Sequence, residues 1–316
     1  MSDLILHHYA GSPFSEKVRL VLGFKRVTWK SVTVPMMLPK PDVIALTGGY
    51  RRAPFLQIGA DIWCDTALMC RVIDQLAPQP PLYPDAAGGV QNVIAQWADT
   101  TLFWTAIPYT MQPAGLQHIF AGAPPEVVKA FIADRAAMTA GMKRPGTADA
   151  KAHLASYFGW LERELGDGRP FLCGSAACIA DFAVAQSPWY IRRVPSVATV
   201  LAPFPRLLAW FERVREFGHG SYETMTSGDA IGVARAATPV GPLSFDDGHG
   251  FARGDEVTVT PTDYAQDPVA GRLVGLAHDE VAIERDDERA GRVVVHFPRI
   301  GYRLKKPDTT SAGLTA

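Results

Sequence analysis

The sequence is short of cysteine and of long apolar runs, and each shortage excludes whole classes of protein. Only four of its 316 residues are cysteine, at positions 64, 70, 173 and 178, and none forms a C-x-x-C pair. No histidines stand at zinc-ligand spacing, so we expect free thiols, no metal and a cytoplasmic setting. No apolar run reaches the roughly 20 residues of a membrane-spanning helix, and the N-terminus lacks the basic and apolar segments of a signal peptide.

An excess of charge of either sign is also missing. The chain has 31 lysines and arginines against 32 acidic residues, which gives a formal net charge of −1. Composition therefore offers no argument for binding nucleic acid or an anionic membrane surface. With 47% hydrophobic residues, the chain has the composition of a globular protein, and its length suits two or three domains.

Residues 1–76 alternate between strand and helix patterns. We predict strands at 4–8 and 28–34, helices at 14–24 and 42–46, a hairpin at 55–63, and a helix from 65 or 66 to about 76. The order β-α-β-α-β-β-α contains one parallel pair and one antiparallel hairpin. The proline-rich segment at 77–88 predicts a linker after this first domain.

Residues 12–19, SPFSEKVR, form the turn between the first strand and the first helix. Ser12 stands just before a helix N-terminus, where free backbone N–H groups and the helix dipole favour an anion. In one interpretation Ser12 is only an N-cap. In the other, its hydroxyl donates a hydrogen bond to a bound thiolate and lowers the pKa of that thiol. Motifs further along the chain favour the second interpretation.

Three short motifs together resemble the thioredoxin-like domain of the cytosolic glutathione transferase superfamily. They are SPFSEKVR at 12–19, the pair Ala53-Pro54, and the pair Asp65-Thr66 at the start of the third helix. The chain is most similar to the serine- and cysteine-type branches, namely zeta, tau and omega. The family more often has Glu-Ser where this chain has Asp65-Thr66.

The resemblance implies a site for glutathione as co-substrate. Ser12 would activate the thiol, and the backbone of Ala53, at a proline that is cis in the family, would pair with the cysteinyl unit. Lys40 would hold the glycine carboxylate, and Asp65 with Thr66 would bind the γ-glutamyl end. Glutathione carries carboxylates, an ammonium and a thiol. The positive charge of Lys40 and the negative charge of Asp65 are therefore complementary to its charged ends. The implied glutathione-binding set is Phe14, Lys40, Ala53, Pro54, Asp65 and Thr66.

Residues 90–226 have helical periodicity and resemble the all-helical second domain of the same superfamily. Ile179-Ala180-Asp181 matches the start of the family's core helix, although Cys178 stands where Ser or Thr is usual. In relatives, the first long helix of this domain lines the second-substrate pocket. Phe103, Trp104 and Tyr109 are the candidates here, with helix packing or a subunit contact as the alternative for each.

A further helix at 227–237 is followed by a change to strand periodicity. Short strands around 257–259, 273–276, 281–283 and 292–297 predict a small antiparallel β-barrel of SH3-like type. Its expected role is to cover an apolar surface or add a subunit contact, and we expect it to fold separately and supply no catalytic group. Residues 308–316 read as a frayed tail.

The predicted fold class is therefore α/β plus all-α plus small β. The ranges are 1–77 for the thioredoxin-like domain, 88–237 for the helical domain and 240–307 for the β-barrel. We expect a homodimeric, detoxifying glutathione transferase that attacks a small hydrophobic electrophile and binds neither nucleic acid nor membrane. The alternative is a non-catalytic glutathione-binding or scaffolding protein. Thiol–disulfide exchange ranks lower because both polar residues of the turn, Ser12 and Ser15, are hydroxyls.

Overall fold

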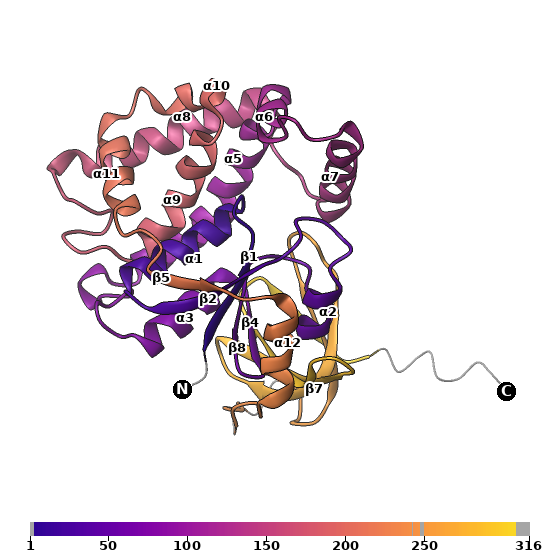
Figure 1. Cartoon of the computed structure of the whole chain (residues 1–316). Helices are drawn as coiled ribbons and strands as arrows, with labels where there is room; N and C mark the ends of the chain where they lie inside the picture. Colours follow the sequence, from indigo (N-terminus) through magenta and orange to yellow (C-terminus); the bar gives the residue numbers. More distant parts are fainter. Residues whose placement is uncertain (1–2, 242, 247–249, 308–316) are drawn as a thin grey trace.

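One ten-stranded sheet runs through the protein, and the helices pack on it (Figure 1). The structure is a computed structural model that describes residues 3–241, 243–246 and 250–307, so the predicted tail at 308–316 lies outside the described residues. The strand order is β10-β6-β7-β8-β9-β4-β3-β1-β2-β5. The N-terminal strands therefore lie in the middle of the sheet, with C-terminal strands on one side of them and β5 on the other.

The first domain has the predicted thioredoxin-like order β-α-β-α-β-β-α. Strand β1 pairs in parallel with β2 and antiparallel with β3, and β3 and β4 form the predicted hairpin. Apolar residues of β1 and β2 that are fully buried, such as Leu6 and Val32, explain why these segments form interior strands. The elements are β1 (Leu4–His8), α1 (Pro13–Phe24), β2 (Thr28–Thr33), α2 (Pro41–Thr47), β3 (Phe55–Ile58), β4 (Asp61–Cys64) and α3 (Thr66–Leu76).

The second domain is helical, as predicted, and joins the first through α9, which packs against α1. A short π-helical segment, Ala98–Leu102, interrupts the first long helix, and Pro108 lies inside the following α5. The helices are α4 (Val90–Trp97), α5 (Phe103–Thr110), α6 (Pro113–Ile119), α7 (Pro125–Met138), α8 (Thr147–Glu164), α9 (Ile179–Arg192), α10 (Pro195–Ala198) and α11 (Pro205–Arg215).

Asp181 holds the start of α9 despite the unusual Cys178. Its carboxylate accepts hydrogen bonds from the backbone N–H of Cys178, at 2.9 Å, and of Leu172, also at 2.9 Å. The indole N–H of Trp210 donates to the same carboxylate at 2.7 Å. These three bonds satisfy a fully buried carboxylate, and the bond from the N–H of Cys178 joins Asp181 to the N-cap residue of α9.

The C-terminal region is rich in antiparallel strands, as predicted. The four predicted strands are present, and a further strand, which the sequence analysis did not predict, follows them. The elements are β5 (Ser221–Thr224), α12 (Ser227–Ala236), β6 (Glu256–Pro261), β7 (Val269–Leu276), β8 (Glu280–Asp287), β9 (Gly291–Pro298) and β10 (Tyr302–Lys305).

The C-terminal strands do not stand apart from the first domain, contrary to the expectation of a separate barrel. Strand β9 pairs in parallel with β4, so the two strand systems share hydrogen bonds across one edge. Helices α12 and α2 lie side by side and contribute to one apolar core with both sets of strands (Figure 1). Strand β5 likewise pairs with β2, although its sequence falls within the range predicted for the helical domain. The strand at an open sheet edge has unpaired backbone N–H and C=O groups. A single sequence does not show which other strand will pair with it.

A buried histidine, His296 of β9, lies at the junction between β4 and β9. Nε2 of His296 lies 2.9 Å from a carboxylate oxygen of Asp61, and Nδ1 lies 2.7 Å from one of Glu280. The ring also stacks on Trp63, with 4.8 Å between ring centroids. Burial alone would lower the pKa of His296, but the hydrogen bonds and charges of the two carboxylates outweigh burial and raise it. The junction therefore holds an imidazolium between two acids.

This arrangement predicts how stability depends on pH. A histidine whose pKa is raised by folding stabilises the fold fully below its unfolded pKa of about 6.5 and loses that contribution as the pH rises through the folded pKa. Each unit by which folding raises the pKa of His296 adds about 1.4 kcal/mol to the free energy of unfolding. Urea unfolding of the wild-type protein at pH 6, 7.5 and 9 should show this loss. His296→Gln should remove most of it, whereas His278→Gln, at an exposed position of the same region, should not. Equal pH profiles for His296→Gln and wild type would contradict the account.

Candidate active site

Two adjoining cavities lie where the three parts of the chain meet. The first, about 600 Å³, is lined by Ser12 and is called the Ser12 cavity. The second, about 740 Å³, is lined by Asp65 and is called the Asp65 cavity. Four residues line both cavities, so the two spaces share a wall. They are Phe14, Arg52, Ala53 and Tyr264.

Ser12 is the N-cap of α1. Its Oγ accepts a hydrogen bond from the backbone N–H of Ser15 at 3.2 Å, which uses a lone pair and leaves the hydroxyl hydrogen available to donate. Ser12 lines the Ser12 cavity, whereas Ser15 is fully buried and lines neither cavity. The two interpretations of Ser12, as a cap and as a donor, are therefore compatible.

Lys40 is a buried cation in the Ser12 cavity. Only 4% of the residue is exposed, and its Nζ donates a hydrogen bond to the carbonyl of Arg51 at 3.0 Å. Burial and the nearby positive charges of Arg135 and Arg51 lower the pKa of Lys40 to about 8, and the charge of Asp134 offsets this only in part. An anion that binds here would relieve an unfavourable buried charge.

Ala53 and Pro54 stand between the two cavities, joined by a cis peptide bond. Ala53 lines both cavities, and Pro54 lines the Asp65 cavity. In that cavity, Asp65 caps α3 by accepting a hydrogen bond from the backbone N–H of Ala67 at 2.9 Å. Thr66 Oγ1 accepts a hydrogen bond from Lys17, a fully buried lysine that is paired with Asp99. The predicted residues thus divide between two neighbouring spaces.

The C-terminal region reaches the Asp65 cavity, which sequence reasoning missed. The hydroxyl of Tyr302 donates a hydrogen bond to Asp65 at 3.2 Å and lies equally far from the hydroxyl of Tyr50. Tyr302 begins β10, the strand that was absent from the prediction, and no local pattern links it to Asp65. The C-terminal region therefore forms part of the wall of the Asp65 cavity.

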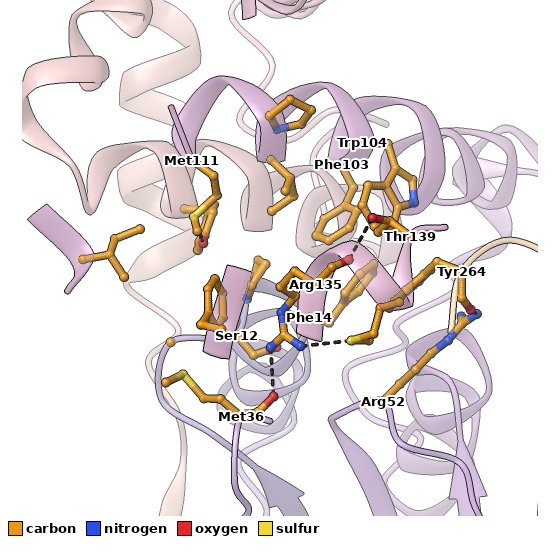
Figure 2. A pocket seen from close by; sticks show the side chains of 18 of the residues that line it. Ser12, Phe14, Met36, Arg52, Phe103, Trp104, Met111, Arg135, Thr139 and Tyr264 are labelled. Atoms are coloured by element: carbon orange, nitrogen blue, oxygen red, sulfur yellow. Dashed lines mark hydrogen bonds between the residues drawn. The ribbon is translucent and has the colours of Figure 1, made fainter. Parts of the chain in front are cut away.

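Residues 262–268, between β6 and β7, cross from the sheet to the helical domain. The ring of Tyr264 covers the guanidinium of Arg52 at 3.8 Å and meets the ring of Trp104 edge-on at 4.9 Å (Figure 2). The next backbone N–H, that of Ala265, donates to the carbonyl of Met138 in α7 at 2.7 Å. Tyr264 consequently stands in the wall that separates the two cavities.

Two of the three aromatic candidates face the Ser12 cavity. Phe103 and Trp104 both line it, and Phe103 packs on Phe14 at 4.4 Å between ring centroids (Figure 2). Tyr109 does not line it. Its ring is buried in the helical core, and its hydroxyl donates to the carbonyl of Val197 at 3.2 Å. For Tyr109 the structure agrees with the alternative of helix packing, because it lies six residues along the helix from Phe103 and so on another face.

Comparisons with known proteins agree with this architecture. Residues 6–81 match the family model of the glutathione S-transferase N-terminal domain, and residues 135–213 match that of the C-terminal domain. A solved structure of a GST-like protein from Pseudomonas syringae is 39% identical, with a TM-score of 0.80, over 97% of this chain and 100% of that one. The chain belongs to the glutathione S-transferase superfamily. Membership indicates a glutathione transferase-type function in general.

More distant structures share the fold. A glutathione S-transferase from Rhodospirillum rubrum is 17% identical, with a TM-score of 0.51, over 67% of this chain and 87% of that one. Glutathione S-transferase III in apo form is 21% identical, with a TM-score of 0.52, over 68% of this chain and 92% of that one. No curated protein matches the chain. The Pseudomonas structure, at 97% coverage, also includes most of the C-terminal strands.

Two features are absent from the described residues. No group of three or more histidine, cysteine, aspartate or glutamate residues there is arranged to hold a metal ion. None of the helices in the same part of the chain is long and apolar enough to cross a bilayer. All four cysteines are free thiols, as predicted.

Tyr302→Phe tests the contact between the C-terminal region and Asp65. Removal of the hydroxyl deletes a partly buried hydrogen bond to a carboxylate, so the free energy of unfolding should fall by about 1–3 kcal/mol. Urea denaturation of Tyr302→Phe, Asp65→Asn and the double variant would measure the coupling between the two side chains. Strictly additive effects would show that the contact contributes nothing.

Proposed function

We propose that the protein is a glutathione transferase in which Ser12 activates the thiol of glutathione for attack on a small electrophile. The observation that carries the proposal is the position of Ser12. A hydroxyl with a free hydrogen stands at the N-terminal end of α1, in the wall of a cavity that also contains a buried cation and aromatic side chains. A thiolate placed there would receive a hydrogen bond and the favourable end of a helix dipole.

The proposed binding mode extends glutathione through both cavities. Its glycine carboxylate would meet Lys40 in the Ser12 cavity, and its γ-glutamyl end would meet Asp65 and Thr66 in the Asp65 cavity. The cysteinyl unit would lie between them, against the backbone of Ala53. Support comes from Ala53 lining both spaces, because a single extended tripeptide needs a continuous path between its two charged ends.

The proposed reaction is nucleophilic substitution or addition by the thiolate. The thiol loses its proton to solvent, and a lowered pKa increases the thiolate fraction at neutral pH. The sulfur forms a bond to an electrophilic carbon of an alkyl or aryl group. In substitution, the leaving group departs with its bonding electron pair, and in addition the substrate takes a proton from solvent. Phe103 and Trp104 would contact the apolar body of that substrate.

We further propose a homodimer in the cytoplasm with a detoxifying role. Four free thiols support a reducing compartment. The edge of β4 is already taken by β9, so the second copy would bind on another surface of the chain.

A non-catalytic glutathione-binding or scaffolding role is the second candidate. One observation favours it: the carboxylate of Asp65 and the hydroxyl of Thr66 already hold Tyr302 and Lys17. Turnover with any of a panel of electrophiles would exclude this alternative, provided that binding of glutathione is shown on the same preparation.

Ser12→Ala tests the proposed activation. One charge-assisted hydrogen bond contributes about 1.5–3 kcal/mol, which corresponds to a rise of about one to two units in the pKa of the bound thiol. Ultraviolet absorbance of the thiolate, titrated against pH, should show this rise in Ser12→Ala, with turnover reduced and glutathione affinity little changed. Ser15→Ala is the matched control and should titrate like wild type. If the thiol pKa is the same in all three proteins, Ser12 has no such role.

The pKa of Lys40 predicts how binding depends on pH. A bound carboxylate favours the charged ammonium, so binding raises this pKa and takes up protons near pH 8. Above pH 8 the free lysine loses its charge, and affinity for S-methylglutathione, which has no thiol, should fall roughly tenfold between pH 7 and pH 9. Lys40→Arg stays charged and should lack this part of the loss in calorimetry. A wild-type profile as flat as that of Lys40→Arg would rule out Lys40 as the carboxylate ligand.

A further inference from the structure

The wall of the Ser12 cavity has an unusual charge balance. Within the described residues, six cationic side chains and no carboxylate line it. The Asp65 cavity, by contrast, has four aspartates beside its three lysines and arginines. The cationic residues of the Ser12 cavity are Lys40, Arg51, Arg52, Arg135, Arg144 and Arg193.

Two carboxylates just outside the wall neutralise part of this charge. Asp134 pairs with both Arg51 and Arg135, and Asp263 pairs with Arg52. The other three cations, Lys40, Arg144 and Arg193, have no carboxylate partner in the part of the chain that the structure describes. The six positive charges are therefore balanced by only two negative charges, which leaves a net excess of four positive charges.

Glutathione does not supply enough negative charge to match the rest. In the proposed binding mode, it brings its glycine carboxylate and its thiolate to this cavity, while its γ-glutamyl end lies in the other one. Two positive charges would still lack a partner. An unmatched cation in a partly buried site is unfavourable, so the remaining space favours an anionic occupant.

Two of these arginines, Arg193 and Arg135, are held in place by neighbouring groups, whereas Arg144 is exposed. The Arg193 guanidinium donates to the carbonyl of Gly11 at 2.7 Å and lies 5.3 Å from the ring centre of Trp189. It therefore stands beside the turn that contains Ser12. Arg135 donates to the carbonyl of Met36 at 2.9 Å (Figure 2). Its guanidinium lies 4.7 Å from the ring centre of Phe131. Positioned guanidinium groups suit the paired oxygens of a carboxylate or sulfonate.

Most of the remaining cavity wall is apolar, apart from Ser12, Thr139 and the hydroxyls of three tyrosines. Side chains of α5, α6 and α7 line it, and they suit an aromatic or aliphatic body rather than a small polar anion. These residues include Phe103, Trp104, Ile107, Met111, Phe120 and Phe131.

We propose that the second substrate is an apolar electrophile that carries a carboxylate or sulfonate group, which Arg144 and Arg193 recognise while the apolar body lies against the α5 side of the cavity. This substrate class rests on the proposed function. It narrows the small hydrophobic electrophile expected from the sequence to one that carries a negative charge, because a neutral molecule would leave the partly buried guanidinium of Arg193 without an anion.

Calorimetry with a matched, unreactive ligand pair tests the proposal. Naphthalene-2-carboxylate and naphthalene-2-carboxamide share an apolar body and differ in charge. With S-methylglutathione at saturation, so that Lys40 is already engaged, the carboxylate should bind at least tenfold more tightly than the amide. Arg144→Gln and Arg193→Gln should each reduce that ratio several-fold and leave amide binding unchanged. Arg163→Gln, an exposed arginine of α8 that lines neither cavity, is the control and should keep the ratio.

The outcomes separate this proposal from the one on which it rests. If S-methylglutathione binds and the carboxylate is not preferred, the substrate class is wrong and the transferase proposal stands. If S-methylglutathione itself does not bind, the transferase proposal fails, and the ligand pair measured without it still tests the arginines. A preference for the carboxylate that appears only without S-methylglutathione would mean that the ligand occupies the Lys40 position, and would overturn the proposal.

Discussion

The parallel pairing of β4 with β9 is the interaction on which the candidate site depends. It fixes the C-terminal strands against the first domain, and His296 between Asp61 and Glu280 adds a buried ionic contact at the same place. Because β9 is fixed, β10 and the loop after β6 are fixed as well. Tyr302 thereby reaches Asp65, and Tyr264 reaches Arg52. The candidate site is thus formed by all three parts of the chain.

The buried charges of the site fall into two groups with different consequences. Lys17 with Asp99, and Arg52 with Asp263, are pairs whose opposite charges offset much of the cost of burial. Lys40 is buried with a carbonyl but without a carboxylate, and its lowered pKa is the physical sign of that deficit. A protein keeps such a cation at a cost in stability, so the deficit is most simply explained by a ligand that supplies the anion. The same argument extends to Arg193 in the wall of the Ser12 cavity, which is partly buried and bound to a carbonyl.

Local motifs in the sequence predicted most of the fold and much of the site. The turn before α1, the Ala53-Pro54 pair and the start of α3 are short patterns whose geometry depends on neighbouring residues, and the structure brings them together around two adjoining cavities. The position of Tyr302 could not be predicted, because it depends on which edge of the first domain's sheet the C-terminal strands pair with. For Tyr109 the sequence allowed a pocket position or helix packing, and its spacing of six residues from Phe103 places it on another face of the helix, in the helical core. The arginines that lack a carboxylate partner could not be predicted either, since the folded structure determines which charged side chains lie close together.

The central claim is that glutathione lies across both cavities, with its sulfur at Ser12. A crystal structure of the full chain with S-methylglutathione tests it most directly. The account predicts the glycine carboxylate at Lys40, the sulfur within hydrogen-bonding distance of the Ser12 hydroxyl, the cysteinyl backbone against Ala53, and the γ-glutamyl ammonium at Asp65. A ligand bound with its sulfur away from Ser12, or confined to one of the two cavities, would contradict it.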